Sequence, residues 1–366
     1  MRSRDGRVPG VGRSLPGLLS ASGLLSASGE LSASGEPSLP PLPADPVVSV
    51  IVPARNAAAS LPAAVASVLD QRPPPAEVVI AVGPSSDDTE AVAADLAAAN
   101  PELVRVVSNP TGRTPDGLNA AIAVARGQVI ARVDAHAELP PGYLATAVAS
   151  LRATGAGNVG AVQHPVAATG FARAVAAAMV SPLGTGGAAY RGGGELRPVD
   201  TAYLGVFRAE ALAAVGGYDP VFTRNQDAEL NLRLARAGYP VWLDPALVVA
   251  YRPRGRVGAL ARQYLEYGRW RRRTGRVHGG SLRARQLVPP AVVVALALAG
   301  VSSTVTRDAR LVGVTAGGYL GVVIGGGARA AHAPRDVPAT ALALATMHLS
   351  WGVGFLLGPP RDGARQ

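Results

Sequence analysis

Asp134 and His136 stand one residue apart, directly after the short apolar run "VIARV" and shortly before the loop signal "ELPPGY". A strand end that presents a carboxylate and an imidazole with this spacing can direct both at one point, which could be a metal ion or a sugar. Alternatively, Asp134 only caps its own turn and His136 is simply exposed. Only the surrounding sequence can distinguish a metal or sugar site from an aspartate that caps a turn beside an exposed histidine.

The composition excludes several kinds of chemistry. The 366 residues include no cysteine, which rules out disulfides, thiolate zinc sites, iron–sulfur clusters and cysteine nucleophiles. All 35 basic residues are arginine, so a P-loop lysine, a Schiff-base lysine and a lysine base are excluded too. The surplus of Ala, Gly, Pro and Arg also suggests a GC-rich coding sequence and is discounted accordingly.

The positive charge is concentrated in one segment. The net charge is +10, and residues 252–285 contain eleven arginines and a single acid, Glu266. Such a segment could bind nucleic acid or flank a membrane helix on its cytoplasmic side. Because no aromatic platform or reader motif accompanies the arginines and apolar segments follow them, the sequence favours the membrane flank.

Strand and helix patterns alternate from residue 47 onward. In chain order, strands are predicted at 47–53, 76–83, 103–109 and 128–134, with helices at 60–71, 86–100 and 114–127 between them. Continuous apolar runs separated by helices predict an α/β fold, a mostly parallel sheet with helices on both faces. Ligands of such sheets bind beyond the carboxyl ends of the strands, where Asp134 lies.

The following part of the chain is less regular. Its predicted elements are strands at 158–165 and 200–210, a helix at 225–238, two short strands within 239–253 and a helix at 256–273. Tyr239, Trp242 and Tyr251 are expected in the core. Residues 1–45 repeat a Ser- and Gly-rich unit that cannot build a core, and they are predicted to be a disordered low-complexity segment and not a signal peptide.

Three apolar segments follow the basic one, and helices are predicted at 287–303, 311–327 and 337–358. Crossing a bilayer takes roughly 20 residues, so the third is a good transmembrane candidate and the first two are marginal unless they extend into their flanks. A buried C-terminal helical domain is the alternative. The predicted organisation is therefore a main domain at 46–275 and a basic flank with membrane helices at 276–366.

Six motifs occur in the order typical of one enzyme family. They are "VSVIVPARN", "SSDDT", "TGRTPDGLNAAIAVARG", "RVDAHAELP", "GGYDPVFTRNQDAELNLRLARAGY" and "QYLEYGRW". In this order they resemble the family-2 inverting glycosyltransferases of the GT-A fold, and most of all the succinoglycan-type members of exopolysaccharide biosynthesis that end in membrane helices. The resemblance covers about residues 47–275 and the C-terminal tail.

The resemblance implies a nucleotide-diphospho-sugar donor and a divalent cation, Mn²⁺ or Mg²⁺, that neutralises the departing diphosphate. Asp134-Ala135-His136 stands at the family's Asp-x-Asp motif, which makes Asp134 and His136 the expected metal ligands. An imidazole suits manganese better than magnesium. The residues expected at the donor are Pro53, Arg55, Asn56, Ser85, Asp87, Arg113, Asn119 and Asp134. The aspartates that usually end the family's second strand are missing at Val82-Gly83, so the nucleotide stays open.

The resemblance also implies a base that deprotonates the acceptor hydroxyl. This role falls to Asp227, the second residue of Gln226-Asp227, where the family has Glu-Asp. A carboxylate at a helix N-terminus is stabilised as the anion, and Glu229 is the rival base. Gln226, Arg269 and Trp270 are expected at the acceptor, although Trp270 could equally be an anchor at the membrane interface.

The predicted function is a membrane-anchored, metal-dependent inverting glycosyltransferase with its catalytic domain in the cytoplasm and multi-pass helices in the cell membrane. It moves a sugar to a lipid-linked or polysaccharide acceptor and has no nucleic-acid partner. The alternatives are a degenerate membrane scaffold, motivated by Val82, Gln226 and Glu266, and a nucleotidyltransferase, for which "PARNAAAS" lacks a Gly-rich loop.

Overall fold

The computed structural model describes residues 39–167, 170–186 and 194–359, so most of the predicted low-complexity segment at 1–45 lies outside the described residues. The strands are β1 (Val48–Ala54), β2 (Glu77–Val82), β3 (Val104–Ser108), β4 (Val129–Arg132), β5 (Asn158–Pro165), β6 (Arg197–Pro198), β7 (Tyr203–Arg208) and β8 (Val241–Tyr251). The helices up to the basic segment are α1 (Leu61–Leu69), α2 (Thr89–Ala99), α3 (Thr114–Val124), α4 (Tyr143–Thr154), α5 (Gly170–Val180), α6 (Pro182–Thr185), α7 (Ala209–Ala214), α8 (Gln226–Arg236) and α9 (Val257–Val277).

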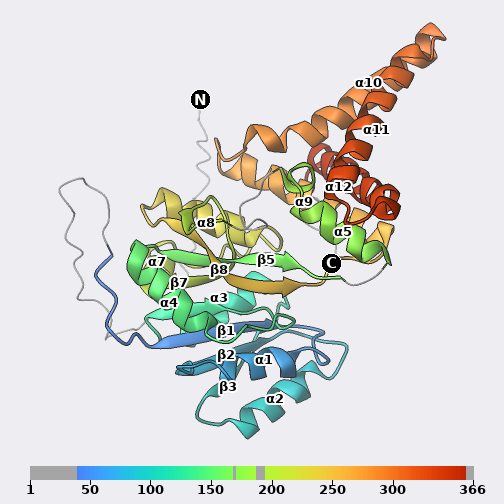
Figure 1. Cartoon of the computed structure of the whole chain (residues 1–366). Coiled ribbons are helices and arrows are strands. Elements are labelled where there is room, and N and C mark those ends of the chain that lie inside the picture. The colour runs from blue at the N-terminus through green and yellow to red at the C-terminus, as the bar shows by residue number, and fades with distance from the viewer. Residues whose placement is uncertain (1–38, 168–169, 187–193, 360–366) are drawn as a thin grey trace, which may run out of the picture. The chain divides into compact units, whose positions relative to one another are not determined.

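The described strands form one sheet in the order β3-β2-β1-β4-β7-β5-β8-β6 (Figure 1). The strands from β1 to β4 pair in parallel, and so do β5 and β8, whereas β6 and β7 run antiparallel to their neighbours. Because β7 runs opposite to β4 and β5, its first residue lies at the edge where those two strands end. Side chains from five strands can therefore meet at this carboxyl edge.

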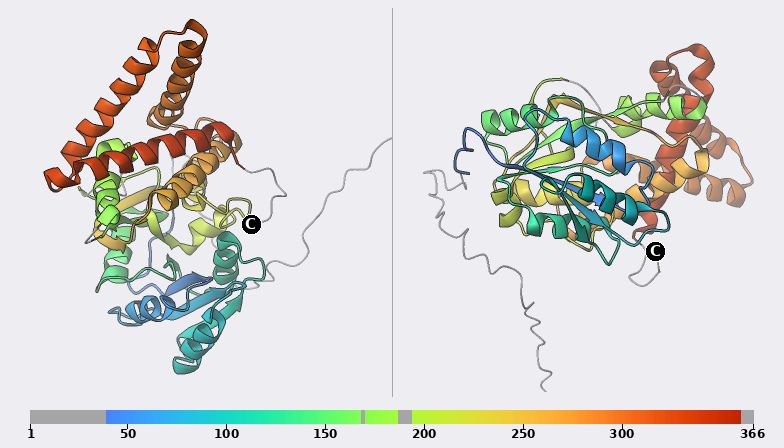
Figure 2. Two further views of the ribbon diagram at one scale, coloured as in Figure 1. Left: turned by 90° about the vertical axis from the view of Figure 1, so that its right-hand side faces the viewer. Right: turned by 90° about the horizontal axis from the view of Figure 1, so that it is seen from below.

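Helices cover both faces of the sheet and bury its apolar residues (Figure 2). Residues of α1, α2 and α4, including Leu61 and Leu151, form one core cluster with the strands. Residues of α3, α7 and α8, including Leu118 and Leu230, form a second cluster on the other face. Burial on both faces explains the continuous apolar runs in the sequence, and the predicted α/β fold is confirmed.

The region predicted as two short strands is one strand, β8, with an irregularity in its middle. Its pairing with β5 moves from Ala161 opposite Asp244 to Val162 opposite Val248, so the residues between bulge out of the ladder. Pro245 stands in this bulge, where its missing N–H takes no hydrogen bond from the sheet. The prediction of two short strands within 239–253 was therefore wrong, because the interruption is a bulge within one strand.

The C-terminal helices are α10 (Val288–Thr306), α11 (Arg310–Ala330) and α12 (Val337–Leu357), with short 3₁₀ turns at Ala284–Gln286 and Pro334–Asp336. In the described part of the chain, three helical segments have the length and composition to cross a membrane: Ala284–Thr306, Arg310–Ala330 and Pro334–Leu357. The two marginal segments thus extend into their flanks, as their short apolar runs required.

Helices α9 and α12 pack with their backbones in contact (Figure 2). A Cβ atom at Gly268 would lie 2.0 Å from the carbonyl oxygen of Trp351, and one at Gly354 would lie 2.0 Å from that of Leu265. Small residues permit this close approach between helices. Arg272 of α9 adds hydrogen bonds from Nη1 to two carbonyl oxygens at the end of α12. The last helix of the α/β region is therefore joined directly to a candidate membrane helix.

Candidate active site

Two carboxylates meet at the carboxyl edge of the sheet. Asp134 begins the turn after β4, in which its carbonyl oxygen accepts a hydrogen bond from the N–H of Ala137 at 2.8 Å, and His136 lies within this turn. Asp227 belongs to the first turn of α8. Asp134, His136 and Asp227 all line one cavity. Residues from two distant motifs of the sequence are thus neighbours in the fold.

Arg132, the last residue of β4, lies between these carboxylates. Its side chain is 5% exposed, and its Nε and Nη2 lie 3.0 and 2.8 Å from Oδ1 of Asp134, while Nη1 donates to Oδ1 of Asp227. Burial lowers the pKa of Arg132, but the charges of the two carboxylates raise that pKa well above its ordinary value. The fork of a guanidinium can bond two carboxylates at once, which an ammonium does less well. Arg132 therefore stays charged and links Asp134 to Asp227.

The surroundings of Asp227 alter its acidity. Burial raises the pKa of the Asp227 carboxyl, Arg132 lowers that pKa and the negative charge of Asp134 raises it, with a net value above the ordinary one. The side chain is 32% exposed and lines the cavity, so a bound molecule can reach it. A carboxylate whose pKa is raised towards neutrality is suited to accept a proton from a substrate.

The residues predicted at the donor divide into two groups. Pro53, Arg55, Asn56, Arg113 and Asp134 line the cavity, as does Gln226. Ser85 and Asp87 lie outside its walls and hold the loop after β1 in place. The N–H of Asn56 donates to Oγ of Ser85 at 3.1 Å, and the N–H of Ala58 donates to Oδ2 of Asp87 at 3.1 Å. Their contribution is to position the loop that carries Arg55.

Three further predicted residues also lie outside the cavity walls. Asn119 bonds both backbone groups of Tyr218, donating to the carbonyl at 2.7 Å and accepting from the N–H at 2.9 Å. Arg269 donates to Glu266 at 2.9 Å, and Trp270 is 5% exposed with its ring 6.1 Å from that of Phe222. The role of Trp270 at the acceptor, like that of Arg269, stays a prediction. Whether Trp270 anchors the chain at a membrane interface also stays a prediction.

The rival base, Glu229, is engaged elsewhere. Its side chain is 1% exposed and forms two hydrogen bonds with Arg233, at 2.7 and 2.8 Å, and a contact of 3.0 Å with Nε2 of His278. It lies outside the cavity walls and ties α8 to the end of α9. The geometry therefore favours Asp227 over Glu229.

Asp134 and His136 are compatible with a divalent cation that is also held by its substrate. Within the described residues, no group of three or more His, Asp or Glu side chains forms a site made of protein alone. Magnesium-type sites commonly use one or two carboxylates and take their remaining ligands from phosphates and water. Both contacts of Asp134 with Arg132 use Oδ1, so a cation would be bound through Oδ2. A carboxylate and an imidazole that face the same cavity fit such a site.

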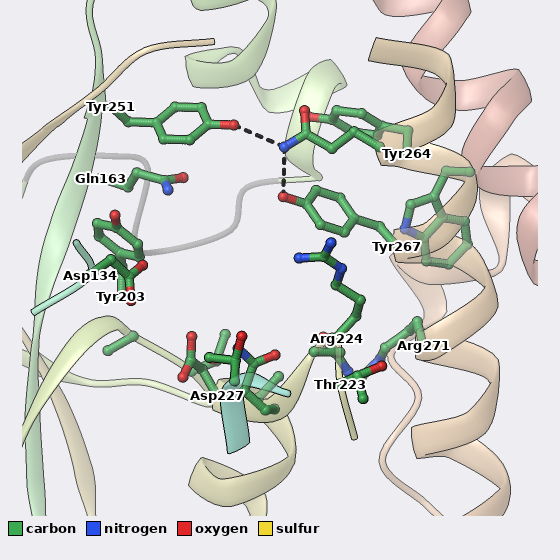
Figure 3. A pocket seen from close by; sticks show the side chains of 18 of the residues that line it. Asp134, Gln163, Tyr203, Thr223, Arg224, Asp227, Tyr251, Tyr264, Tyr267 and Arg271 are labelled. Atoms are coloured by element: carbon green, nitrogen blue, oxygen red, sulfur yellow. Dashed lines mark hydrogen bonds between the residues drawn. The ribbon is translucent and has the colours of Figure 1, made fainter. Parts of the chain in front are cut away.

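The cavity has a volume of about 1030 Å³, and its far wall comes from residues that the sequence analysis did not single out as site residues. Gln163 of β5 and Tyr203 of β7 lie beside Asp134, and Tyr251 of the neighbouring β8 lies beside Gln163, while Tyr264 and Tyr267 of α9 lie opposite (Figure 3). Tyr251 was expected in the core, but it is only partly buried and its hydroxyl accepts a hydrogen bond from Gln263 at 2.9 Å. Gln163 and Arg132 could have been found from the sequence, because each is a polar residue in a strand that is otherwise buried.

The same cavity continues to the candidate membrane helices. Val288, Pro289 and Val292 of α10 and its N-terminal flank line it, together with Met347 and Trp351 of α12. Five arginines line the cavity as well, namely Arg224, Arg254, Arg271, Arg283 and Arg285. One continuous space therefore joins the carboxylates at the sheet edge to apolar helices.

Comparisons with known proteins agree with this architecture. Residues 49–216 match Glycosyl transferase family 2. The succinoglycan biosynthesis protein ExoA of Rhizobium meliloti (strain 1021) is 34% identical over 312 residues, which cover 84% of this chain and 93% of that protein. The chondroitin synthase of Pasteurella multocida (strain Pm70) is 36% identical over 96 residues, 26% of this chain and 10% of that protein.

Among solved structures, a mannosyltransferase from Pyrobaculum calidifontis, in complex with GDP-Man and Mn²⁺, superimposes with a TM-score of 0.59. The two chains are 20% identical, and the match covers 87% of this chain and 89% of the other, which supports the GT-A fold. The likeness to ExoA extends over almost the whole of both proteins. The chain therefore belongs to the family-2 glycosyltransferases.

Proposed function

We propose that the chain is a metal-dependent inverting glycosyltransferase that takes a sugar from a nucleotide-sugar donor and adds it to a lipid-linked acceptor at the cytoplasmic face of the membrane, in the synthesis of an exopolysaccharide or another cell-envelope glycan. The observation that carries this proposal is the single cavity that contains Asp134, Asp227 and the apolar residues of α10 and α12. The name of the relative ExoA supports the exopolysaccharide assignment.

In this proposal, the chain's own residues do two things at the reaction centre. Asp227 accepts the proton of the acceptor hydroxyl while the hydroxyl oxygen bonds to the anomeric carbon and the bond from that carbon to the diphosphate oxygen breaks. Arg132 holds the Asp227 carboxylate in place and keeps it paired with a positive charge. Attack from the side opposite the departing diphosphate inverts the anomeric centre.

Asp134 and His136 would hold a divalent cation, and the complex of the Pyrobaculum mannosyltransferase with Mn²⁺ supports this choice of ion. When bound, such an ion neutralises charge on the departing diphosphate. Arg55 and Arg113 contact the nucleotide in this proposal, and their place in the cavity wall beside β1 and α3 supports the assignment. The chain thus divides the site into a donor side at β1 and an acceptor side at α9.

A lipid-linked acceptor is favoured over a free polysaccharide by the far end of the cavity. Val292, Met347 and Trp351 offer an apolar surface there, and they belong to helices long enough to enter a membrane. A soluble glycan would gain nothing from such a surface, whereas an acceptor carried on a lipid reaches the site from the bilayer. The arginines that line the same cavity can form ion pairs with an anionic lipid headgroup.

The test is donor turnover by the full-length protein in lipid nanodiscs. Purified protein is given a panel of nucleotide sugars with Mn²⁺, with and without a lipid extract of the source membrane, and nucleotide release is measured. We expect release from one donor, increased by the lipid extract and abolished by excess chelator. Donor binding without any release, in the presence of every acceptor fraction, would instead support a degenerate scaffold. Transfer to a delipidated polysaccharide fraction alone would contradict the lipid-linked acceptor and identify a polysaccharide as the acceptor instead.

A further inference from the structure

Gln163 is a buried polar side chain with an unused hydrogen-bond acceptor. It is 7% exposed, and its Oε1 has no hydrogen-bond partner among the described residues. An unsatisfied buried carbonyl oxygen is costly, and in a native fold it calls for an explanation. Gln163 lines the cavity, and its side chain is directed into the space between Tyr203 and the tyrosines opposite (Figure 3). A bound molecule that donates a hydrogen bond to Oε1 would supply the missing partner.

The position of Gln163 brings this oxygen close to the reaction centre. Gln163 lies beside Tyr203 (Figure 3), and burial together with the charges of Asp134 and Asp227 raises the pKa of the Tyr203 hydroxyl. Gln163 and Tyr203 come from adjacent strands, β5 and β7, at the carboxyl edge of the sheet. A group bound at Oε1 is therefore beside the two carboxylates and away from Arg55 and Arg113 on the donor side.

The wall opposite Gln163 is aromatic. Tyr264 is 6% exposed and Tyr267 is 36% exposed, and their rings pack edge to face with centroids 5.4 Å apart. Gln263 fixes this wall, because its Nε2 donates to the hydroxyls of both Tyr251 and Tyr267 at 2.9 Å. Tyrosine rings offer an apolar body with a polar tip, which is suited to a flat molecule that carries hydroxyl groups.

We propose that Gln163, Tyr203 and Tyr267 form the binding site for a neutral pyranose ring at the end of the acceptor, with Oε1 of Gln163 accepting a hydrogen bond from one of its hydroxyls. This assignment rests on the proposed function and specifies its acceptor: the attacking group is a sugar hydroxyl and not a phosphate of a lipid. A phosphate would bring a second anion beside Asp134 and Asp227, and a carboxamide oxygen would repel it. Among the arginines that line the cavity, Arg224 lies beside Tyr267 (Figure 3), so the experiment includes a phosphate probe.

The experiment is saturation-transfer NMR on the full-length protein in nanodiscs. The probes are methyl glucopyranoside, methyl galactopyranoside and methyl mannopyranoside, with methyl phosphate as the control compound. The main variant is Gln163→Met, which keeps the side-chain length and removes the acceptor oxygen. The matched control is Gln128→Leu, a change of the same kind at the exposed start of β4, on the opposite edge of the sheet.

We expect at least one pyranoside to give saturation transfer with the wild type, whereas methyl phosphate gives none that depends on Gln163. Loss of one net hydrogen bond predicts binding about 3- to 10-fold weaker in Gln163→Met and unchanged in Gln128→Leu. Tyr267→Ala is the second variant, because its partly exposed ring can be removed with less risk to folding, and it should weaken the same pyranoside. Donor affinity, measured by calorimetry, should stay unchanged in all three variants.

Four results would overturn the proposal. They are no saturation transfer from any pyranoside, equal pyranoside binding by wild type and both site variants, a Gln163-dependent signal from methyl phosphate, and a parallel loss of donor affinity that would assign Gln163 to the donor side. Failure of the proposed function is a separate observation, since it appears as absent nucleotide release and leaves pyranoside binding measurable.

Discussion

Replacing Arg132 by methionine should change both the stability of the enzyme and the pH dependence of its rate. The substitution keeps most of the side-chain volume and leaves Asp134 and Asp227 without the positive charge between them. Removing one partner of a buried ion pair costs about 3–5 kcal/mol. Because the Asp227 side chain is 32% exposed and water can screen it, we expect a smaller loss, about 2–3 kcal/mol.

The pH dependence follows from the sign of each interaction. Burial raises the pKa of Asp227 and Arg132 lowers it, so removal of Arg132 raises this pKa further. A neighbouring arginine typically lowers the pKa of an aspartate by about 1–3 units. Since the base must be ionised, the acid limb of the rate profile should move to higher pH by about 1–3 units in Arg132→Met. Below the new pKa, the ionised fraction falls tenfold for each pH unit.

The assay is the initial rate of nucleotide release between pH 5 and 9, normalised to folded protein. Arg208→Met is the matched control, because Arg208 is also a buried arginine at the end of a strand, is paired with Glu210 and lies outside the cavity walls. It should reduce stability without moving the acid limb. An unshifted acid limb in a folded Arg132→Met protein would refute the assignment of Asp227 as the base held by Arg132.

The remaining predictions concern the metal, the base, the topology and the helix crossing. His136→Asp should keep activity and shift the preference from manganese towards magnesium in a metal titration, because an oxygen ligand suits the harder ion, and full wild-type activity in excess chelator would contradict the metal role. Asp227→Asn should lower turnover about 10²–10⁴-fold and leave calorimetric donor affinity almost unchanged, whereas Glu229→Gln should reduce stability and change turnover per folded molecule only a few-fold. Three spans with the basic segment inside put the C-terminus outside, so a reporter fused there should read as external, and a cytoplasmic reading would mean that one segment does not cross. Gly354→Leu should disrupt the contact of α9 with α12 and increase protease sensitivity, while Gly318→Leu on α11, where a Cβ meets nothing within 4 Å, should behave like the wild type.

The order of the elements could be predicted because local patterns encode it. Continuous apolar runs between helix patterns predicted the parallel strands from β1 to β4, and Asp134 was correctly expected at a strand end. The helix α4 was missed, since its Ala- and Thr-rich sequence gives weak periodicity. The insertion of β7 between β4 and β5 could not be predicted either, because pairing between distant strands leaves no local pattern.

The lining of the cavity was easier to predict beside β1 and β4 than beside α9. Family motifs indicated Asp134 and Asp227, but motif spacing cannot reveal that Arg132 bonds both of them. The same limit applies to α9, where the motif drew attention to Trp270 while the cavity is lined by Tyr264 and Tyr267. Which side of a helix faces a cavity depends on what packs against its other sides, and here that partner is α12.

In the proposed membrane-bound enzyme, the close contact of α9 and α12 at two glycines would link the cavity mechanically to the bilayer. Because the two backbones touch at Gly268 and Gly354, α12 cannot change its tilt without carrying α9 along. Helices answer a bilayer thinner or thicker than their apolar length by tilting. Tyr264 and Tyr267 belong to α9 and line the cavity. A change in lipid chain length should therefore move α9 together with α12 and alter the width of the cavity.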